Sequence, residues 1–410
     1  MHTDHDVEVC IVGAGPVGGT LAARLAGAGV RTALIDRAAL PPMEHPDFDG
    51  RAYAVAAGSR RVLEEAGLWD QLPLPANPIR RIRVSDGKPG RAASRLHLHF
   101  DVAAVEDAAA PFADAPAFGW MVEARSLRMA LNARLHALAD LSLFAPAEAA
   151  VERDADGATV RIAGGPTLRA RLVVAAEGRR SPLREAAGIR VTHLPYGQTG
   201  IVFAIAHELP HDDTALEHFL PGGPFAQLPM APTEGAPHLS AIVWTERDAL
   251  AKHILSLDEA RFTREVARRL GGHLGAIRLV GRRWSYPLAA LVVHSITAPR
   301  LALVGDAAHG IHPIAGQGLN LGFQDVGPLA DLVIAAVAAG DDPGGEAVLR
   351  RYSAARRPAV MAMTAMTDGL DRLFSNDFFP VRLARDLGIA AVDRIGPLKR
   401  LFMRRAMGVG

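Results

Sequence analysis

The chain has 410 residues, 49% of them hydrophobic, and a formal net charge of +1. This length favours two sequential or interleaved units, and the near-neutral charge excludes the basic field typical of nucleic-acid-binding proteins. The single cysteine, Cys10, excludes a disulfide framework and a dithiol redox centre. The polar N-terminus carries no signal-peptide pattern, and no apolar run reaches the ~18–20 residues of a membrane span. We therefore expect a cytoplasmic protein.

Residues 7–36 predict a strand, a glycine-rich turn, a helix and a second strand. The G-x-G-x-x-G pattern of Gly13, Gly15 and Gly18 lies directly between the first strand and the helix. Such glycines let backbone approach a pyrophosphate at the helix N-terminus. Asp36 ends the second strand, where dinucleotide-binding folds place a ribose-binding carboxylate, and Arg37 follows it. The pattern predicts dinucleotide binding without separating FAD from NAD, and the absence of a second copy fits a fixed FAD with a visiting NAD(P)H.

The middle of the chain predicts a second unit. Residues 118–138 predict a strand and an amphipathic helix, and residues 147–175 predict a β meander with a turn at Asp156-Gly157. Residues 190–284 contain strand-like runs and one helix near 257–270, but no phosphate-binding loop, so we interpret them as a substrate domain that roofs the cofactor. The histidines at 97 and 99 lack partners at metal-ligand spacing, and we expect no metal site. Four large residues of this domain line a pocket or form core: Phe225, Leu228, Trp244 and Tyr286.

Residues 300–333 predict a buried strand, an acidic stop, a glycine-rich loop and a helix. Gly305 and Asp306 follow the apolar run 301–304, and apolar residues recur at helical spacing from Leu319 to Val333. An acid at a strand end can accept hydrogen bonds from a polyol, and a helix N-terminus offers free N–H groups. Both suit a reduced flavin, although a buried turn would explain the same pattern.

The same segment resembles the second flavin-binding motif of the aromatic hydroxylases of the p-hydroxybenzoate hydroxylase type. Its longer pattern, D-A-A-H-x-x-H-P-x-x-G-Q-G-x-N-x-G, is most similar to that of the ubiquinone-biosynthesis FAD-dependent hydroxylases. The resemblance implies that Asp306 holds the flavin ribityl chain, that the loop lies along the isoalloxazine ring, and that the N–H groups of Gly318 and Leu319 stabilise the reduced ring. The matching residues are Gly305, Asp306, Pro313, Gly316, Gln317, Gly318, Leu319 and Asn320.

The resemblance extends to other segments. It implies that Arg51 supports the pyrophosphate side of the flavin, and it makes Arg125 a further flavin contact, although this chain has Ala124 where the family has asparagine. The family's third motif, D-G-x-x-S-x-x-R, keeps its glycine, serine and arginine here but has Glu177 in place of aspartate, a change that we expect to be tolerated. His309 and His312 could move protons or serve structure; His312 and Pro313 are candidates beside the flavin, and no catalytic base is assigned.

The resemblance implies an α/β fold: a Rossmann-type FAD-binding domain like that of glutathione reductase, interleaved with a β-sheet substrate domain and followed by C-terminal helices. It implies a monooxygenase that uses NAD(P)H and O2 to hydroxylate a polyprenyl phenol of ubiquinone synthesis. A prenyl reductase, a hydroxylase of a soluble aromatic acid and a flavin-bound assembly subunit remain alternatives. The expected divisions are FAD-binding 1–75, 101–185 and 285–343, substrate-binding 76–100 and 186–284, and a helical segment 344–410.

The C-terminal end is a short basic amphipathic segment. Five basic residues, Arg394, Lys399, Arg400, Arg404 and Arg405, are interleaved with Leu398, Leu401, Phe402 and Met403. Such a segment can lie on anionic lipid, where each basic residue contributes about 1 kcal/mol. Peripheral contact with the inner membrane, docking to other enzymes of the pathway and a packed terminal helix all fit this pattern.

Overall fold

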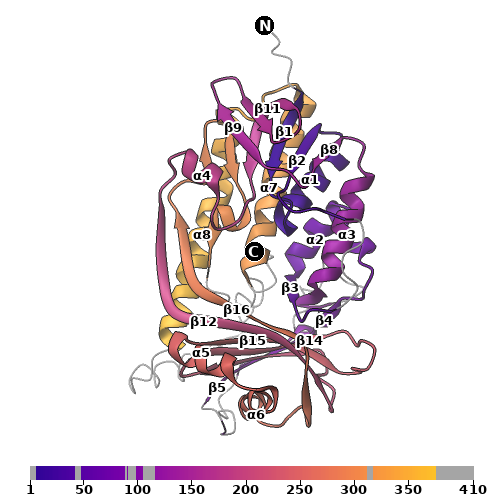
Figure 1. Cartoon of the computed structure of the whole chain (residues 1–410), viewed down its shortest axis with the longest axis vertical. Helices are drawn as coiled ribbons and strands as arrows, with labels where there is room; N and C mark the ends of the chain where they lie inside the picture. The colour runs from indigo at the N-terminus through magenta and orange to yellow at the C-terminus, as the bar shows by residue number, and fades with distance from the viewer. Residues whose placement is uncertain are drawn as a thin grey trace.

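The computed structural model describes residues 6–41, 48–87, 90, 98–104, 116–311 and 317–374. The chain forms two stacked bodies, a Rossmann-like upper body and a large lower sheet, and it crosses between them several times (Figure 1). His312, Pro313, Gly316 and the basic segment 394–405 lie outside the described residues.

The upper body is built on a sheet of order β17-β18-β11-β1-β2-β8. All neighbours from β18 to β8 pair in parallel, so their carboxyl ends lie at one edge. Ligands of open parallel sheets bind at that edge. The strands are β1 (Val7–Val12), β2 (Thr32–Ile35), β8 (Leu141–Phe144), β11 (Thr167–Ala175), β17 (Thr297–Ala298) and β18 (Leu301–Leu303), with β9 (Ala149–Arg153) and β10 (Ala158–Ile162) extending β11.

Helices of the upper body pack on this sheet through a shared apolar core. One of them, α7 (Gln317–Ala339), is long and apolar enough to cross a bilayer, but half of the relevant window is buried inside the protein. A core helix has this character, because an all-round apolar helix is covered by its neighbours. The other helices are α1 (Pro16–Gly27), α2 (Ala57–Glu65), α3 (Ala124–Ala137), α4 (Pro182–Ala186) and α8 (Glu346–Phe374).

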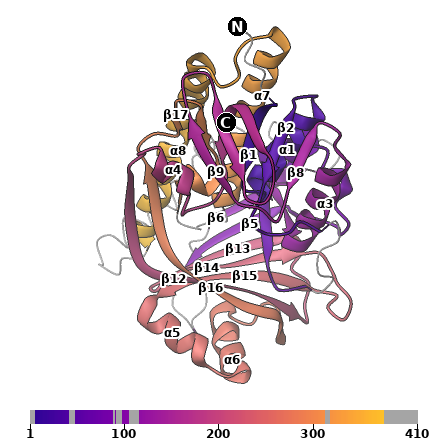
Figure 2. The ribbon, with the colours of Figure 1, turned by 45° about the horizontal axis from the view of Figure 1, so that its top comes forward.

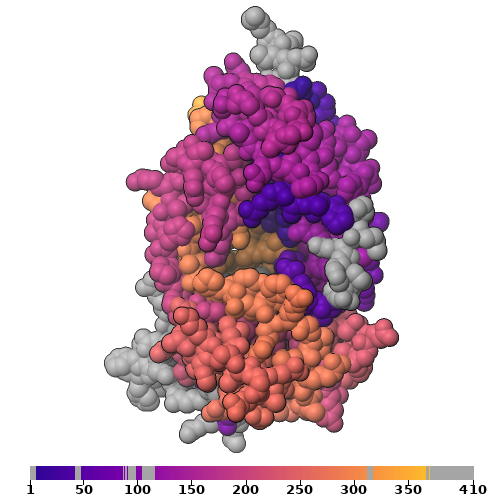
Figure 3. Space-filling view, viewed as in Figure 1, coloured from indigo at the N-terminus to yellow at the C-terminus, as the bar shows by residue number. Residues whose placement is uncertain are grey.

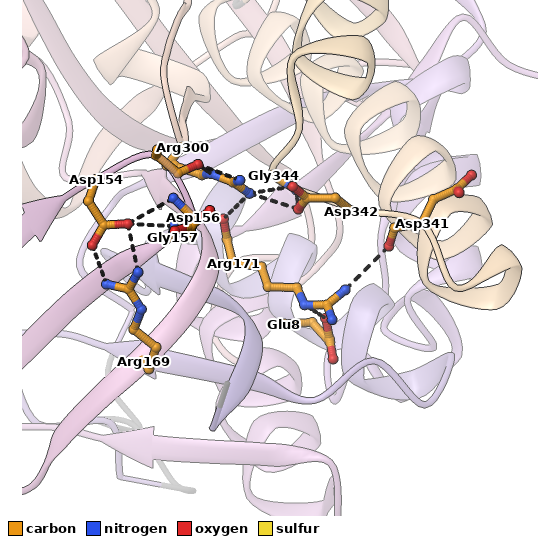
Figure 4. Close-up of polar contacts among 11 residues, drawn as sticks. Glu8, Asp154, Asp156, Gly157, Arg169, Arg171, Arg300, Asp341, Asp342 and Gly344 are labelled. Atoms are coloured by element: carbon orange, nitrogen blue, oxygen red, sulfur yellow. Dashed lines mark hydrogen bonds and ion pairs between the residues drawn. The ribbon is translucent and has the colours of Figure 1, made fainter. Parts of the chain in front are cut away.

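Ion pairs brace the amino-end edge of the upper sheet (Figure 4). Arg171 of β11 lies 3.3 Å from Glu8 of β1, and Arg300, just before β18, lies 2.6 Å from Asp342 in the loop between α7 and α8. These ion pairs tie neighbouring strands and the loop between α7 and α8 together at the edge opposite the carboxyl ends.

The lower body is a large sheet of order β19-β16-β12-β15-β14-β13-β5-β6 (Figure 2). Two strands of 17 residues dominate it, β12 (Val191–His207) and β16 (Ile277–Val293), the latter running past the expected boundary at residue 284. The remaining strands are β5 (Arg81–Asp86), β6 (Leu98–Asp101), β13 (Thr214–Leu220), β14 (Gly223–Met230), β15 (Leu239–Arg247) and β19 (His309–Gly310).

The two faces of this sheet have different partners. On the outer face, Phe203, Phe225 and Trp244 pack against α5 (Asp248–Ser256) and α6 (Glu259–Leu270). On the inner face, Ala204, Ala215 and Ala241 pack toward a small sheet of β3 (Ala52–Ala56), β7 (Gly119–Glu123) and β4 (Asn77–Ile79). The inner face therefore looks toward the upper body.

The elements expected from the sequence differ from the structure in two helices. We predicted one helix in the lower body, but α5 precedes α6. Residues 346–374 form the single helix α8 with Pro358 inside it, where the sequence predicts two helices, 347–356 and 358–374. Burial of Tyr352 and Arg356 against the upper body stabilises the first half of α8, and this tertiary packing outweighs the hydrogen bond that proline removes.

Candidate active site

The first glycine-rich turn lies at the carboxyl end of β1. Gly13 has φ +106°, and a Cβ there would collide with the carbonyl of Ala176. A Cβ on Gly18 would collide with the carbonyl of Gly13. Gly15 caps α1 without a side-chain hydrogen bond, and the space beside it is open. The first turn of α1 carries no acidic side chain, so its N–H groups can bind an anion such as a pyrophosphate.

Asp36 holds this turn to the end of β2. One carboxylate oxygen accepts the N–H of Ala14 at 2.6 Å, and the other accepts the N–H of Ala38 at 2.7 Å. Arg37 beside it is exposed. Arg128 of α3 donates to the carbonyl of Ala14 at 3.1 Å. This arginine was not predicted, because no local motif marks it and only folding brings α3 to the turn.

The Gly305-Asp306 turn meets the first turn of α1. Gly305 has φ +59°, and a Cβ on it would lie 3.3 Å from Val17. A Cβ on Gly322 in α7 would lie 2.7 Å from the same Val17 side chain. These close approaches need glycine at both positions. They bring together three segments that are far apart in the sequence.

Asp306 remains available for a ligand. Its side chain is 56% exposed, and its nearest described ion partner, Arg179, is 3.8 Å away. Gly318, in the first turn of α7, also borders open space. An accessible carboxylate and the start of α7 therefore lie at the turn that follows the same strand, and binding of a polyol chain and an anion-forming ring there stays a prediction.

Asn320 has a positioning role. Its side chain is 1% exposed; its amide oxygen accepts the N–H of Ala56 at 2.8 Å, and its amide nitrogen donates to the carbonyl of Ala54 at 2.8 Å. The amide thus pairs with β3 much as a neighbouring strand would. Asn320 fixes the start of α7 against β3, and with it the position of Gln317, Gly318 and Leu319.

Glu177 caps the short helix α4. Its carboxylate accepts the hydroxyl of Ser181 at 2.5 Å and the N–H of Leu183 at 3.3 Å, while burial raises the pKa of Glu177. Arg184 reaches from α4 to the carbonyl of Ala307 at 3.0 Å. The third motif therefore braces the Gly305-Asp306 turn, and tolerance of Glu177 in place of aspartate stays a prediction.

A buried carboxylate, Asp325 of α7, fixes the other side of that turn. It accepts the N–H of Gly305 at 2.9 Å, the His309 ring at 2.7 Å and the Arg356 guanidinium of α8 at 2.7 Å. Burial would raise the pKa of Asp325, but His309 and Arg356 outweigh it and hold the pKa below its usual value. His309 is 3% exposed, so the structure places it in this network. In the sequence, a single acidic residue on the apolar face of the predicted helix was the signal that could have identified Asp325.

Arg51 and Arg125 lie where the two bodies meet. Arg51 pairs with Asp49 at 2.6 Å and lies 4.6 Å from the ring centre of Trp284 in the large sheet. Arg125 pairs with Glu123 at 2.6 Å. The space-filling view shows a hollow at the centre of this side of the molecule, between the upper body and the large sheet (Figure 3). The site therefore combines a dinucleotide cradle with a recess roofed by a sheet.

Comparison with known proteins decides the family. The chain matches the FAD binding domain family over residues 6–367. It belongs to this family. Two similar relatives are the ubiquinone hydroxylase UbiL of Rhodospirillum rubrum, 49% identical over 99% of this chain and 90% of that protein, and the 3-demethoxyubiquinol 3-hydroxylase of Escherichia coli, 32% identical over 99% and 100%. The fold is shared with p-nitrophenol 4-monooxygenase PnpA of Pseudomonas putida, at a TM-score of 0.75 and 20% identity over 98% of each chain.

FAD is thus the cofactor of this FAD-binding-domain protein, and the described residues fit it. The open space at Gly15 and Gly318 leaves room for backbone contacts, and the carboxylate of Asp306 is exposed. Phe225 and Trp244, proposed from the sequence as pocket or core, are core on the outer face, whereas Tyr286 is 45% exposed.

Replacing Asp325 with alanine should destabilise the protein by about 3–5 kcal/mol, because the Arg356 charge would stay buried without its partner. The measurement is urea unfolding at neutral pH. The control is Asp331→Ala on the same helix, whose 67% exposed carboxylate pairs with Arg24 and should cost at most about 1 kcal/mol. Because the folded pKa of Asp325 is lowered, its contribution is present above the ordinary value of 3.8 and is lost as the pH falls through the folded pKa. Equal losses in the two variants would contradict this role.

Asp306→Ala should weaken FAD binding by about 1.5–3 kcal/mol for each ribityl hydrogen bond lost. The measurement is fluorescence titration of the apoprotein with FAD, again with Asp331→Ala as the control. Stability should change little, because the Asp306 carboxylate is exposed and its contact with Arg179 is long. Unchanged FAD affinity would remove Asp306 from the site.

Proposed function

We propose that this protein is an FAD-dependent monooxygenase that uses NAD(P)H and O2 to hydroxylate the aromatic ring of a polyprenyl phenol in ubiquinone biosynthesis. The observation that carries the proposal is that Gly15, Gly318 and the exposed Asp306 carboxylate border open space in a protein that adds a second, large sheet to its parallel one. Likeness over almost the full length to ubiquinone hydroxylases supports the substrate class.

The cofactor contacts follow from the geometry above. FAD supplies the electron transfer and the oxygen chemistry when bound. The N–H groups at Gly15 hold the pyrophosphate, Asp36 binds a ribose hydroxyl, and Asp306 accepts from the ribityl chain. The first turn of α7 stabilises negative charge on the reduced ring. The proposed set is completed by Gly13, Gly18, Arg37, Arg51, Arg125, Gly305, Pro313, Gly316, Gln317, Leu319 and Asn320, with His312 and Pro313 nearest the chemistry.

The inner face of the large sheet supplies the rest of the active centre. Leu228, Ala241 and Met230 belong to an apolar cluster there, in which Ala241 and Met230 are buried against the small sheet. This apolar character favours an aromatic ring and the start of a prenyl chain beside it, and it excludes water from the reacting centre. A hydroxylase of a soluble aromatic acid would instead need a cation on this face to hold the carboxylate.

The holoenzyme should be yellow, lose its flavin absorbance on addition of NAD(P)H, and convert a short-chain prenyl phenol to a product heavier by one oxygen atom. Mass spectrometry of the product is the measurement, because a prenyl reductase adds hydrogen and a flavin-bound assembly subunit forms no product. Quinone profiling of a deletion strain identifies the step from the intermediate that accumulates. Activity on aromatic acids but on no prenyl phenol would contradict the proposed substrate.

We propose that the C-terminal basic segment holds the protein at the cytoplasmic surface of the inner membrane, where a polyprenyl substrate resides. We expect wild type to float with anionic liposomes. A variant with Lys399, Arg400, Arg404 and Arg405 changed to glutamine should float less while keeping its activity on a short-tailed substrate. Equal flotation of the two proteins, or none by either, would refute lipid docking and leave partner docking or a packed helix.

A further inference from the structure

Glu217 is a carboxylic acid on the apolar inner face of the large sheet. Register places it there: on β13 it lies opposite Ala226 of β14 and Val84 of β5. Ala215, two residues earlier on the same strand, belongs to the cluster that packs toward the upper body. Because side chains alternate along a strand, Ala215, Glu217 and Phe219 share this face.

The surroundings of Glu217 are apolar. Phe219, Leu98, Val84 and Phe100 form one cluster beside it, and Ala215 packs with Ile79 and Met121 of the small sheet. Charged residues near this stretch include Arg83 and Arg81 of β5, opposite Leu216 and Thr214, and the pair of Arg80 and Asp213 (3.5 Å) just before β13. Within the described part of the chain, Glu217 makes no hydrogen bond or ion pair, yet its side chain keeps some exposure.

Another acid of the large sheet, Glu246, is an example of a carboxylate with structural partners. Glu246 of β15 lies on the outer face, is 6% exposed, and contacts the Arg269 guanidinium of α6 at 3.8 Å. Its carboxylate also accepts the N–H of Arg247 at 3.1 Å. Burying a carboxylate without such partners is costly. Among the described residues Glu217 has no such partner, and desolvation raises its pKa to about 7.

We propose that Glu217 is the polar contact of the substrate sheet: its carboxylate accepts a hydrogen bond from a ring hydroxyl of the phenolic substrate. The partly buried side chains of Val84 and Phe100 beside it contact the ring. This assignment rests on the proposed function and names the group that orients the ring within it. A phenol donating to a carboxylate is also more electron-rich, which favours attack by electrophilic oxygen.

The test compares a short-chain prenyl phenol with its methyl ether, which has the same shape but no hydroxyl donor. Binding to the oxidised holoenzyme is followed by perturbation of the flavin absorbance. Wild type should bind the phenol at least about tenfold more tightly than the ether, since a hydrogen bond to a charged acceptor is lost with the ether. That preference should weaken as the pH falls below about 7, because the carboxylate becomes protonated.

Three variants make the test specific. In Glu217→Leu and Glu217→Gln the preference for phenol over ether should fall to about twofold or less, and its pH dependence should vanish. In Glu246→Gln, the outer-face control, the preference should remain while the melting temperature drops. Glu217→Gln should raise the melting temperature at alkaline pH and hardly change it at acid pH, because the folded pKa is raised and ionisation opposes folding above it.

The outcomes separate this assignment from the proposed function. If wild type hydroxylates the phenol but both Glu217 variants keep its preference over the ether, Glu217 does not contact the substrate and the function stands. A lower melting temperature of Glu217→Gln at alkaline pH would likewise overturn the assignment, since it would show a partnered carboxylate. If wild type neither binds nor hydroxylates any prenyl phenol, the proposed function fails and this assignment fails with it.

Discussion

The buried carboxylate of Asp325 is the interaction on which the cofactor site depends. It receives the backbone N–H of Gly305, the ring of His309 and the guanidinium of Arg356, which come from the strand end, the following loop and α8. A carboxylate in the core is tolerated only when its lone pairs are satisfied. Satisfying them fixes the turn at φ +59° for Gly305, and that turn presents Asp306 outward. The buried Asp325 thus positions Asp306, the exposed carboxylate that is available to a ligand.

The same site is held from its other side by backbone contacts between distant segments. Gly13 touches the carbonyl of Ala176, and Val17 fits against Gly305 and Gly322. Each of these contacts excludes a larger residue at the glycine. The glycines are therefore required for the packing of neighbouring elements as well as for contact with a ligand. The sheet brings these segments to one edge, because its parallel strands, from β18 to β8, all end there.

Local patterns were sufficient to predict the first β-α-β unit and the strand before Asp306. The strands Val7–Val12 and Thr32–Ile35 lie within residues 7–36, where the sequence predicts them, since glycine spacing and apolar runs are short-range signals. Contacts between distant segments could not be predicted this way: Arg128 reaches the first turn from α3, and Arg356 reaches Asp325 from α8.

The alternation of side chains between the two faces of each strand was also visible in the sequence. It could not show that Trp244 faces α5 and α6 while Leu228 faces the upper body, because the layers that cover each face were unknown.

The pairing of β19 with β16 has a consequence for recombination. His309 and Gly310, directly after the Gly305-Asp306 turn, form the last strand of the large sheet, where they pair with Val292 and Leu291. The lower body is therefore not a module that could be transplanted between flavoproteins by exchanging one continuous segment. A chimera cut at the loops on either side of residues 191–293 would keep the cofactor turn but lose the donors and acceptors of its neighbouring strand. Exchange of substrate preference within this fold is easier through side chains on the inner face than through whole domains.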